Sequence, residues 1–108
     1  DIAPYDPIFY PYKYLLERTY DFITCTETLE HFANPNIEIT KIKKLLKPNG
    51  ILGIMTSILA SWSDFSKWYY HRDPTHIAFY SKHTMEWIAG KFSWNIEFPR
   101  ENVVLFKL

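Results

Sequence analysis

The chain has 108 residues, of which 47% are apolar and 19% aromatic, so it can build one hydrophobic core and is not disordered. Twelve basic residues balance twelve acidic ones, which removes the bulk electrostatic argument for nucleic acid or an anionic membrane as a partner. The longest uncharged stretch, residues 48–63, is too short to span a bilayer. Cys25 is the only cysteine, so there is no disulfide framework, and we expect a reducing, cytoplasmic setting.

The first 19 residues contain three prolines, which hold the residues before them in extended conformations. We expect a strand remnant and a loop here, with one or two helical turns at residues 14–18. The short apolar run at residues 22–25 follows, between the charge of Asp21 and a polar cluster that begins at Thr26. This pattern predicts a buried parallel strand.

A helix is predicted next, over residues 35–46. Asn34 can cap its N-terminus, and Pro35 suits its first position. Pro-Asn-Gly at residues 48–50 then predicts a turn into a second apolar strand at residues 51–55. The right-handed crossover rule places the two strands side by side and parallel. Ligands of such sheets gather at the carboxyl ends of the strands, which here means residues 26–31 and 56–62.

The rest of the chain is predicted to contain one long connection, followed by a helix and two strands. Residues 58–80 are rich in aromatic and histidine side chains, and long ordered connections tend to be functional. Ser81 resembles the N-cap of a helix that runs to about Phe92. Two further strands, at residues 94–98 and 102–106, have so short a connection that they must form an antiparallel pair.

This order of elements resembles the C-terminal half of the class I S-adenosylmethionine-dependent methyltransferases. The resemblance rests on the segments YDFITCTETLEHF, LLKPNGILGIMT and DPTHIAFYS, and on the helix and hairpin that follow them. It implies an α/β fold with a partial Rossmann-like sheet, in which parallel strands and a C-terminal antiparallel hairpin carry helices on their faces. Residues 1–108 would form a single partial domain, divided into an N-terminal remnant (1–19), a strand-helix-strand core (20–57), an acceptor loop (58–80) and a helix with the hairpin (81–108).

The resemblance also assigns a cofactor, S-adenosylmethionine. Asp6 matches the acid that binds the ribose hydroxyls in that family, and Thr26 and Glu27 lie where the cofactor would meet the end of the first apolar strand. The family's glycine-rich loop is absent, because the chain has only three glycines and none precedes Asp6 in a strand-to-helix turn. Without the strand that carries this loop, the 22–25 strand has an open apolar edge, and such edges pair with other chains. We therefore expect a fragment of a longer methyltransferase, or a partner chain or second copy at this edge.

Glu27, Glu30 and His31 have the spacing i, i+3, i+4, which places all three on one face of a helix that begins near Thr26. Carboxylates and an imidazole can hold a divalent ion such as Mg²⁺. The pattern is similar to the metal site of small-RNA 3′-terminal 2′-O-methyltransferases, and a similar sequence pattern occurs in ubiquinone-pathway O-methyltransferases. This resemblance implies that His76 is the distant ligand. The alternative is that the acids only complement a helix N-terminus and His31 is a structural contact.

His76 and His71 flank an Arg-Asp-Pro turn, so either could take a proton from an acceptor hydroxyl. The resemblance favours His76 as the catalytic residue. An Asp-Pro turn with a histidine bonded to the backbone is the structural alternative. The aromatic residues of the connection could stack on an acceptor or simply cap the core, and His83 is expected at the surface.

These features favour S-adenosylmethionine-dependent O-methylation of a small-molecule acceptor by the full-length protein. One alternative is a non-catalytic fragment that pairs through its open sheet edge. Another is a metal-assisted RNA 2′-O-methyltransferase, against which the neutral charge weighs. The sequence does not identify the acceptor, because substrate choice depends on variable loops.

Overall fold

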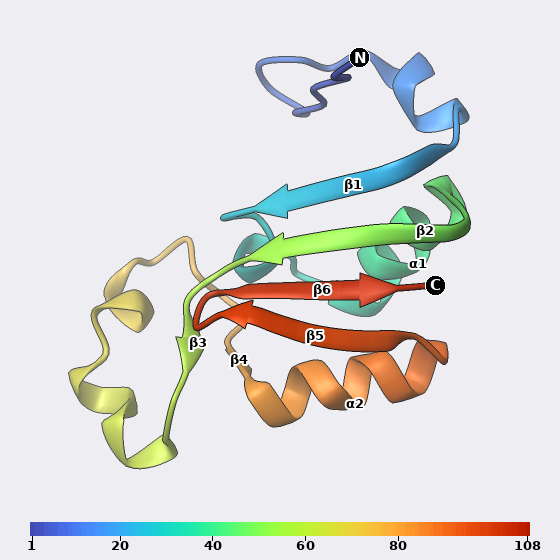
Figure 1. Ribbon diagram of the computed structural model, residues 1–108. Coiled ribbons are helices and arrows are strands. Elements are labelled where there is room, and N and C mark those ends of the chain that lie inside the picture. Colours follow the sequence, from blue (N-terminus) through green and yellow to red (C-terminus); the bar gives the residue numbers. More distant parts are fainter.

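A four-stranded mixed sheet forms the centre of the computed structural model, which describes all 108 residues (Figure 1). The strands lie in the order β1 (Tyr20–Thr26), β2 (Leu46–Met55), β6 (Val103–Lys107) and β5 (Asn95–Arg100). β1 and β2 are parallel, and β6 runs antiparallel to both of its neighbours. The predicted α/β class, the parallel pair and the C-terminal hairpin are confirmed.

Two helices begin at the residues that the sequence indicates. Asn34 caps α1 (Pro35–Leu45) by accepting a hydrogen bond from the Ile37 amide, with Pro35 in the first turn. Ser81 caps α2 (Lys82–Phe92) by accepting from the Thr84 amide. Both caps satisfy an amide that has no partner within its helix.

One face of the sheet carries the hydrophobic core. Leu52, Ile54, Val104 and Phe106 alternate along β2 and β6 and are fully or almost fully buried. They belong to one cluster of thirteen buried residues that also contains Ile39 of α1 and three residues of α2, namely Met85, Ile88 and Ala89. Both helices therefore cover the same face. Because successive side chains in a strand point to opposite faces, the residues between these core positions line the other face.

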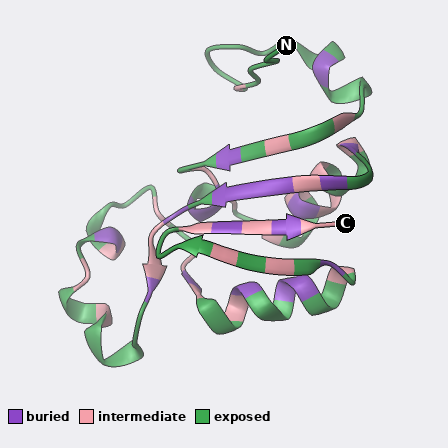
Figure 2. Ribbon diagram, viewed as in Figure 1, coloured by how far each residue is buried: buried purple, intermediate pink, exposed green.

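β1 is an edge strand, as predicted from the missing neighbour. The prediction that residues 22–25 are buried is wrong for most of the strand: Cys25 is buried, but Phe22 is 51% exposed. Figure 2 shows the contrast between a largely exposed β1 and a largely buried β2. A strand with a neighbour on one side and helices on one face exposes its remaining face and edge.

No separate turn connects α1 to β2, because α1 ends at Leu45 and β2 begins at Leu46. The predicted turn at residues 48–50 lies inside β2, where the register with β1 shifts between Tyr20 and Phe22. Asn49 adopts a left-handed conformation with φ of 63°. A Cβ atom on Gly50 would lie 2.8 Å from the Lys47 carbonyl oxygen, so glycine is required for this close approach.

The remaining elements are short. The N-terminal segment contains one 3₁₀ helix, η1 (Lys13–Glu17), and lies beyond the β1 edge (Figure 1). Residues 58–81 contain the strands β3 (Ile58–Leu59) and β4 (Tyr80–Ser81), which pair with each other, and two further 3₁₀ helices, η3 (Trp62–Lys67) and η4 (Tyr69–Arg72). This connection projects from the end of the sheet where β1 and β2 finish (Figure 1). No helix in the molecule has the length and apolar character needed to cross a membrane.

Candidate functional site

The backbone after β1 turns sharply at the predicted site. Glu27 has a φ of 47°, in the left-handed region, and only a three-residue 3₁₀ helix, η2 (Leu29–His31), follows it. The predicted helix that begins near Thr26 is therefore wrong, and Glu27, Glu30 and His31 do not share a helical face. A non-glycine residue in the left-handed region is uncommon and often marks a functional turn.

Glu30 is a completely buried carboxylate at the carboxyl ends of β1 and β2. Its Oε2 accepts a hydrogen bond from the Thr56 hydroxyl (2.9 Å), and its Oε1 accepts one from the Tyr70 hydroxyl (2.5 Å). Burial alone would raise the pKa of Glu30, but hydrogen bonds, that from Tyr70 foremost, outweigh it and place the pKa below its ordinary value. Glu30 is thus held as a charged group inside the protein.

The two predicted histidines lie together beside Glu30. Their ring centroids are 4.9 Å apart. His31 Nδ1 donates to the Thr75 carbonyl (2.8 Å), and His76 Nδ1 donates to the Tyr70 carbonyl (2.7 Å). Because a carbonyl can only accept, each Nδ1 carries a proton, and in the neutral ring Nε2 is left with a free lone pair.

Glu30, His31 and His76 each offer a ligand atom within 4.8 Å of the others. Ligand atoms about 2.1 Å from one ion lie no more than about 4.2 Å apart, so side-chain shifts of about 1 Å would complete a site. Metal-bound histidines commonly donate their second ring nitrogen to a carbonyl, as both do here. The residues present therefore fit a divalent cation. Glu27 lies outside this group, and its Oε2 accepts a hydrogen bond from the Tyr70 hydroxyl at 2.7 Å.

Asp73 completes the surroundings of His76. Its Oδ2 lies 3.6 Å from His76 Nε2. Hydrogen bonds from the Thr75 hydroxyl and amide lower the pKa of Asp73, so its carboxylate stays ionised. An ionised carboxylate therefore lies beside the second ring nitrogen of His76.

The predicted cofactor residues have simpler environments. Thr26 is exposed at the end of β1, and its carbonyl accepts a hydrogen bond from the Thr28 hydroxyl. Asp6 Oδ1 accepts from the amides of Ile8 and Phe9, so this side chain stabilises its own turn. One carboxylate oxygen of Asp6 is left without such a bond, and its ribose-binding role stays a prediction.

The aromatic connection builds a cluster around Phe65. The rings of Trp62, Trp68, His71 and Phe79 all lie within 6.1 Å of it, centroid to centroid. His71 stacks on Phe65 and donates to the Trp68 carbonyl, which ties it to its own loop. His83 is exposed on α2, as expected. The structure thus brings His76, and not His71, to Glu30 and His31.

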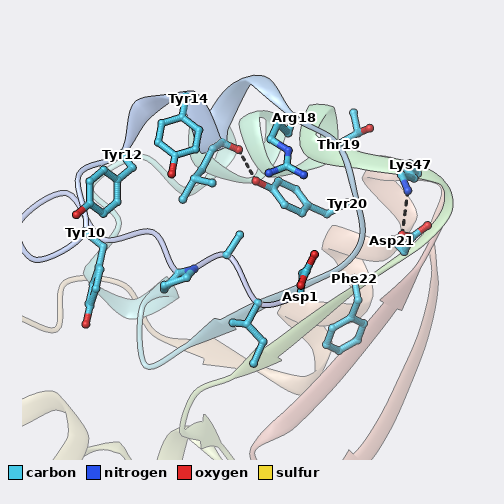
Figure 3. Close-up of a pocket in the computed structure, with 14 residues that line it drawn as sticks. Asp1, Tyr10, Tyr12, Tyr14, Arg18, Thr19, Tyr20, Asp21, Phe22 and Lys47 are labelled. Atoms are coloured by element: carbon cyan, nitrogen blue, oxygen red, sulfur yellow. Dashed lines mark hydrogen bonds and ion pairs between the residues drawn. The ribbon is translucent and has the colours of Figure 1, made fainter.

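A cavity lies at the opposite end of β1. It has a volume of about 790 Å³ and is bounded by the N-terminal segment and the first residues of β1. Figure 3 shows Tyr10, Tyr12 and Tyr14 around it, together with the Lys47–Asp21 ion pair at its margin. It is at the amino-terminal end of β1, whereas the cluster of Glu30, His31 and His76 is at the carboxyl end.

Sequence reasoning singled out neither Thr56 nor Tyr70 as a member of this cluster, although Thr56 begins the segment 56–62 in which ligands were expected. Both are buried, and both donate to Glu30. Burial and the neighbouring Glu30 raise the pKa of Tyr70 above its ordinary value, so it keeps its proton. Thr56 could have been found from its place directly after an apolar strand, whereas nothing in the spacing separates Tyr70 from the adjacent aromatic residues.

Comparisons with known proteins relate the chain to methyltransferases. Residues 3–97 match the model of a methyltransferase domain family. The chain is 41% identical over 49 residues to a ubiquinone biosynthesis O-methyltransferase of Pasteurella multocida, over 44% of this chain and 20% of that protein. It is 53% identical over 32 residues to the Photobacterium profundum protein of the same name, over 30% of this chain and 14% of that protein. The matched segments thus span a fifth or less of these relatives.

A solved structure from Thermotoga maritima shows the same fold. It is described as an S-adenosylmethionine-dependent methyltransferase and a possible histamine N-methyltransferase. The TM-score is 0.63 at 13% identity, over 83% of this chain and 56% of that one. Its likeness supports the assignment of the sheet and not of an acceptor. With most of its length matched by the family model, the chain belongs to the methyltransferase domain family, and its elements correspond to the C-terminal half of the class I S-adenosylmethionine-dependent fold.

Proposed function

We propose that the protein containing this chain transfers a methyl group from S-adenosylmethionine to a hydroxyl oxygen of a small molecule. The observation that carries the proposal is the state of His76, whose Nδ1–H donates to a carbonyl while Nε2 faces Asp73 and the buried Glu30 cluster. The curated relatives are named as O-methyltransferases, which supports oxygen as the methylated atom.

S-adenosylmethionine supplies a methyl group on a positively charged sulfur. As the acceptor oxygen bonds to the methyl carbon, the carbon–sulfur bond breaks and the hydroxyl proton must leave. His76 Nε2 can accept that proton, and Asp73, 3.6 Å away, stabilises the charged ring that results. The remaining contribution of the protein is to align the reactants, because transfer requires an in-line approach.

Thr26 and Glu27 are proposed to meet the cofactor at the end of β1, and Asp6 to bind its ribose. The fit of these residues to the cofactor is partial. The chain has three glycines, and none lies in a strand-to-helix turn. The close backbone approach of a glycine-rich loop must therefore come from outside these 108 residues.

A divalent cation held by Glu30, His31 and His76 is proposed as a second cofactor. It would supply a positive charge that polarises an acceptor oxygen. Two imidazoles and one carboxylate suit Mn²⁺, Co²⁺ or Zn²⁺ better than Mg²⁺, which prefers oxygen ligands. If His76 is a ligand, its Nε2 is not free to accept the proton, so these two roles of His76 are alternatives.

The test measures S-adenosylhomocysteine release by the protein with hydroxylated aromatic acceptors and, in parallel, with amine acceptors such as histamine. We expect a methyl ether as the product. Methylation of the amines alone would contradict oxygen as the target, and failure of S-adenosylmethionine to bind the protein would contradict the whole proposal.

A second proposal concerns the β1 edge, which we infer to pair with a strand from outside these 108 residues. Nine of the fifteen exposed large hydrophobic residues lie within the first 22, with Phe22 on the edge strand itself. Such a surface favours association. Light scattering should show the isolated chain associating with itself in the absence of that strand, and less association for Phe22→Lys; a strictly monomeric wild-type chain would contradict this.

A further inference from the structure

Tyr70 lies in the loop helix η4 and contacts two of the three residues proposed to bind a cation, Glu30 and His76, as well as the neighbouring Glu27. Its side chain is 4% exposed. The hydroxyl reaches Glu27 and Glu30, and the backbone carbonyl of the same residue reaches His76. We infer that Tyr70 is the positioning residue that holds Glu27, Glu30 and His76 in one arrangement for a divalent cation. This inference rests on the metal-binding part of the proposed function.

The Tyr70 hydroxyl lies beside more hydrogen-bond acceptors than it has protons to donate. Tyr70 Oη lies 2.7 Å from Glu27 Oε2 and 2.5 Å from Glu30 Oε1. It also lies 3.2 Å from the Thr56 hydroxyl, which donates to Glu30 Oε2. Tyr70 has one proton, so it can donate to only one of the two carboxylates at a time. A shared donor therefore brings two like charges together and leaves one carboxylate oxygen without a partner.

An incompletely satisfied pair of carboxylates beside two free imidazole nitrogens is the environment that a cation completes. Glu30 Oε1, the atom that Tyr70 contacts most closely, also lies 3.9 Å from His31 Nε2. If Glu30 held a cation, the Tyr70 hydroxyl could donate to Glu27 Oε2, which it already contacts at 2.7 Å. The hydroxyl thus fits both the metal-free and the metal-bound arrangement.

The rest of Tyr70 orients His76. The carbonyl accepts from His76 Nδ1 at 2.7 Å, which directs Nε2 away from the loop backbone. The Tyr70 and His76 rings also pack together, with centroids 4.1 Å apart. Only the hydroxyl contacts are lost in Tyr70→Phe, since the ring and the carbonyl remain. That substitution therefore isolates the link to the carboxylates.

The test is a titration of the protein with Co²⁺, followed by its visible absorption bands, which report the number and type of ligands. Tyr70→Phe should weaken Co²⁺ binding about tenfold and alter the bands, as loss of a residue that orients metal ligands does. Tyr69→Phe is the matched control, because Tyr69 is the adjacent tyrosine and is 71% exposed. It should change neither affinity nor spectrum.

Equal affinity and spectrum for wild type and Tyr70→Phe would overturn the inference. A wild-type protein that binds no Co²⁺ would also overturn the inference. That result would not contradict the proposed methyl transfer, which is measured separately through the release of S-adenosylhomocysteine. If Tyr70→Phe fails to fold by circular dichroism, 3-fluorotyrosine at position 70 keeps the ring and makes its hydroxyl a stronger donor. Its Co²⁺ affinity should then differ several-fold from that of the wild type, and an unchanged affinity would overturn the inference.

Discussion

Thr56→Val tests whether the buried carboxylate is held by the hydroxyls around it. Thr56 and Glu30 are both fully buried, and the Thr56 hydroxyl donates to Glu30 Oε2 at 2.9 Å. Valine replaces that hydroxyl with a methyl group of similar size, so the substitution removes a hydrogen bond without opening a cavity. Thr56→Ser keeps the donor and removes only the methyl group.

A hydrogen bond to a charged group contributes about 1.5–3 kcal/mol, so Thr56→Val should lower the free energy of unfolding by about this amount at pH 7. Thr56→Ser should lower it by about 1 kcal/mol, the value of one buried methyl group with a small cavity. The valine substitution also raises the pKa of Glu30, because it removes one of the hydrogen bonds that lower it.

The sign of the pH dependence follows from the direction of the Glu30 shift. Its pKa in the folded protein lies below the ordinary value of 4.5, so its charged form stabilises the fold. That stabilisation is fully present above about pH 4.5 and is lost as the pH falls through the folded pKa. The deficit of Thr56→Val should therefore be largest at neutral pH and shrink as Glu30 takes up its proton.

Urea denaturation followed by circular dichroism, at pH 7 and at several values below 4.5, measures both effects. If Thr56→Val is as stable as the wild type at pH 7, the hydrogen bond does not hold a charged Glu30. If its deficit stays constant down to pH 3, the loss comes from packing and not from the carboxylate.

Three further predictions concern residues around this site and at the first helix. Cys25, which is buried and whose pKa is raised to about 11, mainly by burial, should not react with a thiol reagent at pH 8 until urea unfolds the chain; rapid reaction of the folded protein would contradict its burial. Burial likewise raises the pKa of Tyr80 from 10 to about 12, so its neutral form stabilises the fold below pH 10 and this contribution is lost as the pH rises through 12. Tyr80→Phe should therefore lose stability less steeply than the wild type between pH 10 and 12 in urea denaturation, and equal slopes would refute this. Asn34→Ala should cost about 1 kcal/mol in the same assay through loss of the α1 cap, and no change would show that the cap is dispensable.

The parts of the fold that depend on local sequence were predictable. Asn34 and Ser81 cap the helices that their spacing indicated, and the two apolar runs became the parallel strands β1 and β2. The hairpin strands lie within about two residues of their expected positions. Each of these elements is determined by residues close together in the chain, so periodicity and capping residues were sufficient.

The site was predictable only in part, because its contacts are long-range. Of the four residues predicted as metal ligands, Glu30, His31 and His76 lie close together and Glu27 lies outside the group. The helix expected from Thr26 does not form, since Glu27 adopts a left-handed conformation that residue spacing cannot indicate. The bonds that hold the cluster join Tyr70 to residues 40 and 43 positions away, and no local pattern singles out that tyrosine.

The exposure of Phe22 was not predicted either, because it depends on which strands lie beside β1 and not on the local sequence. An apolar run is typical of a strand with neighbours on both sides, and the run at residues 22–25 does not itself indicate that one neighbour is absent. The glycine count indicated the missing partner, and the sheet order agrees with it: β1 has β2 on one side and no strand on the other.

The most direct measurement compares methyl transfer by His76→Gln and His83→Gln in the protein that contains this chain. His76 lies in the cluster with Glu30 and His31, whereas His83 is exposed on α2. We expect His76→Gln to lower kcat about 100-fold, the smallest effect usual for loss of a proton acceptor, and to leave the KM for S-adenosylmethionine nearly unchanged. His83→Gln should behave as the wild type. Full activity of His76→Gln would contradict the assignment of the reaction to the carboxyl ends of β1 and β2.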